Sequence, residues 1–92
     1  MNKIEFVLRD NKIKQVELLE KSWELAIEQE KNKKTGLFDR GILRQNVYKI
    51  VANKCNPTIK TLNKIAICIN EIIKDRGIEK EPYTAADLIG DV

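Results

Sequence analysis

From Pro57 to Gly77 the apolar side chains recur every three or four residues, which is the spacing of one face of an α-helix. Asn followed by Pro is typical of a helix start, and Gly is typical of a helix stop. This stripe consists of Ile59, Leu62, Ile65, Ala66, Ile69, Ile72 and Ile73. Since no stretch of the chain alternates with period two, the sequence predicts an all-α fold.

Four other segments carry shorter helical patterns, and 92 residues are the size of one small domain. We expect helices at about Lys3–Arg9, Lys14–Lys33, Ile42–Lys54 and Tyr83–Ile89, giving about five in all. The second is long and free of Gly and Pro, and Gly36 is its expected stop. Its apolar stripe is predicted to be Val16, Leu19, Trp23, Ala26 and Ile27, with Leu18 beside it. Residues 78–92 form a linker and the last short helix.

Charge is distributed unevenly along the chain. Residues 1–39 contain eight bases and eight acids, residues 40–70 contain six bases and no acid, and residues 71–92 contain three bases and six acids. A central third without carboxylates suits a surface that faces a polyanion, because any acid there would repel phosphates.

The composition argues against several classes of protein. No apolar run approaches the roughly 20 residues that cross a bilayer, and no signal peptide is evident, so we expect a cytoplasmic protein without a membrane partner. The chain has no His, no Gly-rich phosphate loop and only two isolated cysteines, Cys55 and Cys68. We therefore expect no enzymatic activity, no metal and no cofactor.

Residues 44–66, RQNVYKIVANKCNPTIKTLNKIA, resemble the second half of the Cro/cI-type (XRE) helix-turn-helix domain. That half typically contains a recognition helix, a turn, Asn-Pro-Ser/Thr and a helix reading Leu-x-x-Leu-x-x-Ile-Ala. The segment IKQVELL at 13–19 resembles the family's Leu-Thr-Gln-Glu-Glu-Leu-Ala. The resemblance implies a lambda-repressor-like helical bundle that binds double-stranded DNA as a regulator of transcription, in most cases a repressor.

The chain departs from that family pattern at three places. Twenty residues, 22–41, separate the segments matching helices two and three, where the family has about four. They form an insertion or a lengthened second helix. Leu19 stands where a small residue is usual, and Leu43 replaces the usual Ser/Thr cap. Asn53 replaces the usual Gly, and Asn tolerates the left-handed conformation better than most residues.

In a helix-turn-helix the N-terminal part of the recognition helix reaches base edges. Glutamine pairs with adenine, and Arg or Lys with guanine, in the major groove. The predicted base-reading residues are Arg44, Gln45, Tyr48 and Lys49. The predicted phosphate contacts, which fix position without reading sequence, are Lys14, Gln15, Asn46, Lys54 and Lys60.

Proteins that resemble this chain usually bind DNA as symmetric dimers. Candidate dimer or partner surfaces involve Trp23 and Ile27 of the second helix, or Ile67 and Leu88. Trp23 lies on an apolar stripe, which favours a core or interface position over base stacking. Two alternatives remain: an antitoxin that binds both operator DNA and a toxin protein, and an all-helical protein-interaction module whose basic face is incidental.

Overall fold

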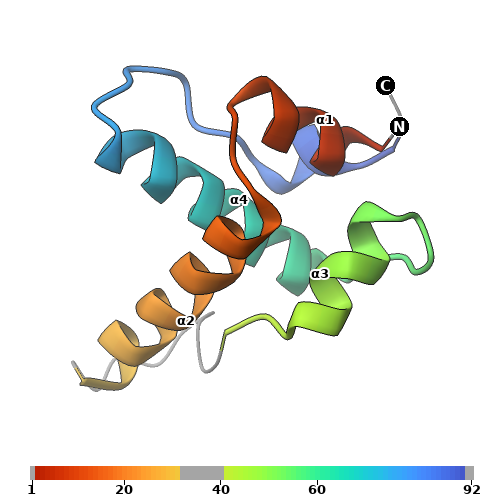
Figure 1. The fold of residues 1–92 in the computed structure, drawn as a ribbon, viewed down its shortest axis with the longest axis horizontal. Helices are drawn as coiled ribbons and strands as arrows, with labels where there is room; N and C mark the ends of the chain where they lie inside the picture. The colour runs from red at the N-terminus through yellow and green to blue at the C-terminus, as the bar shows by residue number, and fades with distance from the viewer. Residues whose placement is uncertain (1, 32–40, 91–92) are drawn as a thin grey trace.

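The computed structural model of the protein describes residues 2–31 and 41–90. These residues form α1 (Lys3–Asp10), α2 (Gln15–Lys31), α3 (Arg44–Val51), α4 (Ile59–Asp75) and a 3₁₀ turn, η1 (Ala85–Leu88), shown in Figure 1. The all-α prediction is confirmed for the described part of the chain, which contains no strand. The expected count was too high, since the fifth element is a 3₁₀ turn and not an α-helix. The predicted stop at Gly36 and the end of the second helix at Lys33 lie outside the described residues.

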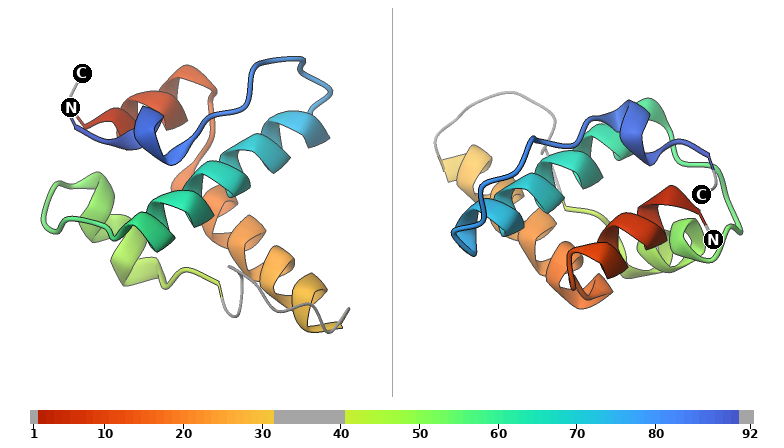
Figure 2. Two further views of the ribbon diagram at one scale, coloured as in Figure 1. Left: turned by 180° about the vertical axis from the view of Figure 1, so that it is seen from behind. Right: turned by 90° about the horizontal axis from the view of Figure 1, so that it is seen from above.

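The helices pack around α4, which runs through the middle of the molecule (Figures 1 and 2). Helix α2 crosses α4, α3 lies near the start of α4, and η1 lies against both α1 and α4. The backbone N–H of Lys3 donates to the carbonyl of Gly90 at 3.0 Å, so the two ends of the described chain are adjacent. The most deeply buried side chains come from α2 and α4: Leu18, Ser22, Ile65, Cys68 and Ile69.

Three of the helices end in the same way, with a residue in the left-handed conformation. These residues are Lys12 (φ 55°), Asn53 (φ 59°) and Gly77 (φ 72°). After α3, the Asn53 N–H donates to the Ile50 carbonyl and the Lys54 N–H to the Lys49 carbonyl, which is the Schellman arrangement. The prediction that Asn53 takes the glycine-like position is therefore confirmed.

Helix α4 begins later than its sequence suggests. Asn56 and Pro57 were expected to cap and start it, but the helix begins at Ile59 with Thr58 as its N-cap. The Thr58 hydroxyl accepts from the Thr61 N–H at 3.2 Å. Asn56 and Pro57 instead lie in the connection that leads from α3 to α4.

The buried face of α2 is only partly the predicted one, since Ala26 is buried and Leu19 packs against the core but the rest of the stripe does not. Leu18, Ser22 and Ala26, four residues apart, face the interior, whereas Val16 and Trp23 are about two-fifths exposed and Ile27 is 63% exposed. Pattern reading passed over this face because a serine lies at its centre. Ser22 is buried at no cost in unpaired groups, since its hydroxyl donates to the Leu19 carbonyl at 2.7 Å and accepts from the Ile42 N–H at 3.0 Å.

Leu88 was proposed as part of a partner surface, and that prediction is wrong. Its side chain is only 2% exposed, because η1 turns it into the core between α1 and α4. The turn is held by Asp87, whose carboxylate accepts from the Thr84 N–H at 2.8 Å. The Asn70 amide fixes the preceding segment by pairing with both the N–H and the carbonyl of Tyr83.

Candidate nucleic-acid interface

Helix α3 has a buried side and an exposed side. Val47, Ile50 and Val51 pack into the core, while Arg44, Gln45, Asn46, Tyr48 and Lys49 are exposed. Its N-cap, Leu43, makes no side-chain hydrogen bond to the first turn. The first turn therefore presents backbone amides that no cap occupies, as the missing Ser/Thr at this position implied.

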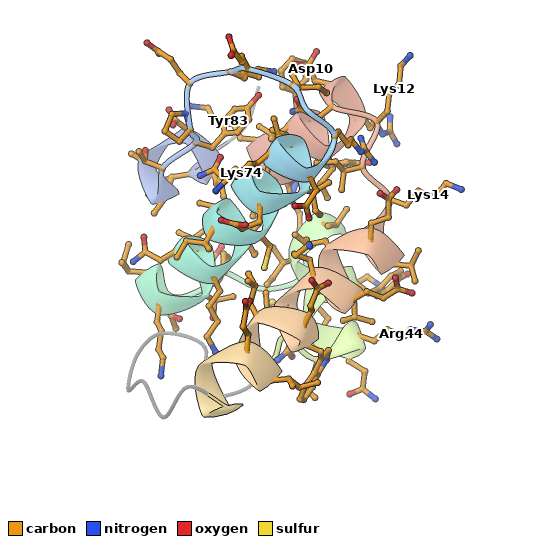
Figure 3. The ribbon with its side chains drawn as sticks, turned by 90° about the vertical axis from the view of Figure 1, so that its left-hand side faces the viewer. Asp10, Lys12, Lys14, Arg44, Lys74 and Tyr83 are labelled. Atoms are coloured by element: carbon orange, nitrogen blue, oxygen red, sulfur yellow. The ribbon has the colours of Figure 1, made fainter. Side chains whose placement is uncertain are left out.

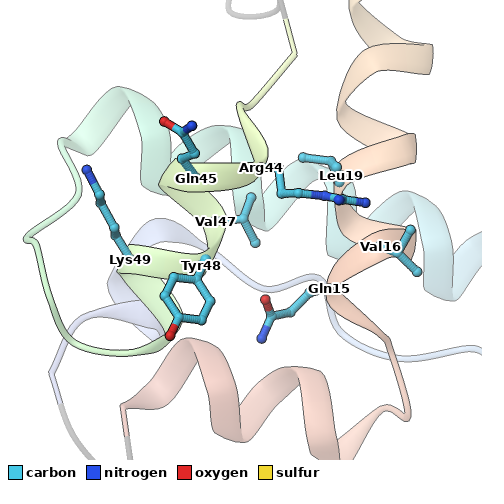
Figure 4. A pocket seen from close by; sticks show the side chains of 8 residues that line it. All are labelled: Gln15, Val16, Leu19, Arg44, Gln45, Val47, Tyr48 and Lys49. Carbon is cyan, nitrogen blue, oxygen red and sulfur yellow. The ribbon is translucent and has the colours of Figure 1, made fainter.

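A groove of about 490 Å³ lies between α3 and the first turns of α2 (Figure 4). The Arg44 side chain extends toward α2 beside Leu19 and Val16, and Gln15 points from α2 toward Tyr48. Gln45 and Lys49 project from the side of α3 that is turned away from α2. The complete lining is Gln15, Val16, Leu19, Arg44, Gln45, Val47, Tyr48 and Lys49.

The groove has a positive charge. Its lining side chains, all within the described residues, include the cations Arg44 and Lys49 and no carboxylate. Lys12, Lys14 and Arg44 project from the same side of the molecule (Figure 3). A concave surface with cations along its edges concentrates field lines and attracts a polyanion.

The other predicted phosphate contacts, on or next to α3 and α4, do not line the groove. Lys54, just after α3, holds its Nζ 5.2 Å from the centre of the Tyr48 ring, a cation–π distance. Asn46 is exposed on α3 but does not line the groove. Lys60 is exposed in the first turn of α4 and is likewise not among the groove residues.

Asn2 fastens the C-terminal end of α3 to α1. Its side-chain N–H group donates to the carbonyl of Ile50 at 2.7 Å, to that of Val51 at 3.2 Å and to Oδ1 of Asn53 at 3.0 Å. Its own Oδ1 accepts from the Glu5 N–H at 2.7 Å and so caps α1. The spacing Asn-x-x-Glu signals the cap, but no sequence signal indicates the contact with α3.

The first turn of α2 is fastened to the end of α4. The Arg76 guanidinium contacts the Glu17 carboxylate at 2.6 Å and donates to the carbonyl of Asn11 at 2.7 Å. The Lys14 backbone N–H, followed by Arg76, lowers the pKa of Glu17 below its ordinary value of 4.5. Because Arg76 and the Lys14 N–H offset the negative charge of Glu17, this carboxylate does little to reduce the positive potential of the groove.

The residues just before α3 contact the middle of α2. The Ser22 hydroxyl binds the Ile42 N–H, and the backbone of Gly41 lies against the Trp23 ring. A Cβ at Gly41 would lie 2.7 Å from Cε2 of Trp23 and closer still to Cγ and Cδ2. Only glycine fits there, so this contact fixes where the chain enters α3.

The sequence predicted most of the polar residues of the groove but not the apolar residues of its walls. Gln15, Arg44, Gln45, Tyr48 and Lys49 were predicted site residues, and the fold brings all five to one groove. Val16 and Leu19 line it too, although they were expected to form a core stripe. Of the predicted partner residues, Trp23, Ile27 and Ile67 are exposed.

The two cysteines differ in environment. Cys55 is exposed in the turn after α3, whereas Cys68 is buried in α4, where burial raises the pKa of its thiol to about 12. Across residues 2–31 and 41–90, no three His, Cys, Asp or Glu side chains gather as metal ligands would. In the same residues, none of the helices has the length and apolar character needed to cross a bilayer.

The chain matches no protein-family model, no curated protein and no solved structure.

Proposed function

We propose that this protein binds double-stranded DNA sequence-specifically, with α3 in the major groove, and that it regulates transcription as a repressor. The observation that carries this proposal is the shared groove: α3 and the start of α2 supply cationic and amide side chains to one exposed surface without a carboxylate. An α-helix fits the width of the major groove, and amide and ammonium groups match the donors and acceptors of base edges.

The side chains divide into two roles. Gln45 and Lys49, on the side of α3 turned away from α2, read bases: Gln45 pairs with adenine N6 and N7, and Lys49 donates to guanine O6 and N7. Tyr48, which is 55% exposed, packs on a sugar or a thymine methyl.

The DNA strand that borders the major groove then crosses between α2 and α3. Arg44 lies along α2 within the groove, so we assign it to this strand together with Lys14 and Gln15. These side chains contact phosphates and set the register of the protein without reading sequence. Lys54 contributes a charge at the far end of α3 and keeps Tyr48 in place through its contact with the ring.

A titration of labelled duplexes by fluorescence anisotropy tests the proposal, after selection of a preferred sequence from a random pool. Affinity for the selected duplex falls steeply with salt and exceeds affinity for unrelated DNA by at least about a thousandfold. Gln45→Ala lowers affinity for the selected sequence by about tenfold to a hundredfold, with little effect on unrelated DNA. Lys14→Ala weakens binding to all sequences and reduces the salt slope by about one.

Lys74→Ala is the matched control for Lys49→Ala, since both remove one exposed lysine. Lys74 lies in the last turn of α4, away from Arg44 in the view of Figure 3. The proposal predicts that Lys49→Ala impairs binding far more than Lys74→Ala does. Equal effects of the two substitutions, or equal affinity for all duplexes, would contradict it and favour the interaction module with an incidental basic face.

A further inference from the structure

The second half of α2 carries an exposed apolar row that the proposed DNA contact does not use. Trp23 is 40% exposed and Ile27 is 63% exposed, one helical turn apart. This part of α2 extends away from α1 and α3 (Figure 1). Exposed aromatic and large aliphatic side chains in one patch are characteristic of protein contacts.

One border of this row is acidic. At 3.6 residues per turn, Glu20 and Glu24 follow the row on the side that faces the end of α4. The surface there also includes Glu17 and Asp75, with Lys21 and Arg76 between them. Lys21 pairs with Asp75 at 2.6 Å and with Glu24 at 3.3 Å. Four carboxylates against two cations leave this border with two negative charges.

We propose that this surface, the α2 docking face (Glu20, Trp23, Glu24 and Ile27), binds a partner protein through a basic amphipathic helix. The apolar stripe of such a helix covers Trp23 and Ile27, and its Lys and Arg side chains pair with the acidic border. Trp23 is a suitable anchor because its other face already rests on Gly41, so little side-chain freedom is lost on binding.

The charges argue against two other occupants. DNA is repelled by the acidic border, whereas the positive groove at the first turns of α2 attracts it. A two-fold antiparallel contact of the docking face with itself brings Glu20 and Glu24 of one copy against the same residues of the other. A basic partner avoids both conflicts.

Trp23 is the only tryptophan in the sequence, so its emission reports on this face directly. The probe is a synthetic amphipathic helical peptide of leucine and lysine, titrated into the full chain beside the same peptide with glutamate at every lysine position. We expect a blue shift of Trp23 emission with the lysine peptide, and at least about tenfold weaker binding of the glutamate peptide.

Glu20→Lys/Glu24→Lys reverses this preference between the two peptides. Its matched control is Glu79→Lys/Glu81→Lys, which makes the same charge change in the exposed segment before η1 and leaves the preference unchanged. Circular dichroism confirms that both variants are folded. Ile27→Asp, which places a negative charge in the apolar row, is a second test of the same face.

Equal binding of the two peptides, no shift with either, or equal effects of the two double substitutions would overturn the proposal. So would a concentration-dependent dimer in sedimentation that Ile27→Asp abolishes, because the face would then join two copies. Duplex binding is measured separately, so failure of the docking face and failure of the DNA proposal are distinguishable.

Discussion

Asn2→Ala tests how firmly α3 is held against the rest of the molecule. The wild-type side chain is 6% exposed and joins two helices, capping α1 through its oxygen and binding the last carbonyls of α3 through its nitrogen. Alanine removes all four hydrogen bonds and offers nothing in their place. The Val51 carbonyl then has no other donor among the described hydrogen bonds, whereas the Ile50 carbonyl keeps backbone N–H donors at the end of α3.

The cost follows from these contacts. Loss of an N-cap destabilises a helix by about 1 kcal/mol. Leaving a buried carbonyl without its donor adds about 1–3 kcal/mol. The free energy of unfolding should therefore fall by about 3 kcal/mol, which in a chain of this size lowers Tm by about 12–24 °C. An isolated cap without the α3 contact would lower Tm by only about 4–8 °C.

Thermal and urea unfolding followed by circular dichroism measures this difference, and Asn2→Asp separates the two roles. Aspartate is as good an N-cap as asparagine. However, it carries no N–H, and it places a negative charge against the α3 carbonyls. We therefore expect Asn2→Asp to be nearly as unstable as Asn2→Ala. An aspartate variant as stable as the wild type would refute the bridge between α1 and α3.

Three further predictions concern single side chains. Cys55 should react with Ellman's reagent in the native protein at about pH 8, and Cys68 only after unfolding, because the second thiol is buried and protonated. Glu17→Gln should destabilise the protein near neutral pH, and the difference in stability from the wild type should shrink as acid is added. A carboxyl group whose pKa is lowered by folding stabilises the native state fully above pH 4.5. That stabilisation is lost as pH falls through the pKa of Glu17 in the folded protein. Lys12→Gly should raise Tm, since a non-glycine residue at φ 55° costs about 1 kcal/mol, and an unchanged or lower Tm in a melting curve would contradict this.

The helices and much of the groove follow from local patterns. Apolar spacing located α1, α3 and α4 to within a few residues, and Asn53 ends α3 as its side chain suggested. The five groove residues foreseen from the sequence lie on helix positions that repeat with the helical period. The period alone therefore places them outside the core.

The errors and omissions of the sequence prediction arise where burial depends on contacts between residues far apart in the sequence. Ser22 lies at the centre of the buried face of α2, where its hydroxyl accepts from the Ile42 N–H, twenty residues away. Asn2 is buried only because α3 ends beside it. The sequence around Leu88 suggests a short helix at the surface, yet η1 packs the Leu88 side chain into the core. Local periodicity contains none of this information, because each case needs a partner from another element.

Residues 22–41, predicted from the sequence to be an insertion or a lengthened helix, need not disturb the groove between α2 and α3. The first ten of them, 22–31, continue α2 as helix. The Ser22–Ile42 hydrogen bond and the Trp23–Gly41 packing hold the residues before α3 against α2. They also bring the chain back to α2 one turn after Leu19, so the walls of the groove, Val16, Leu19 and α3, remain together. The first half of α2 thus serves the groove while the second half is free to bear a separate surface, which is why substitutions on one should leave the other intact.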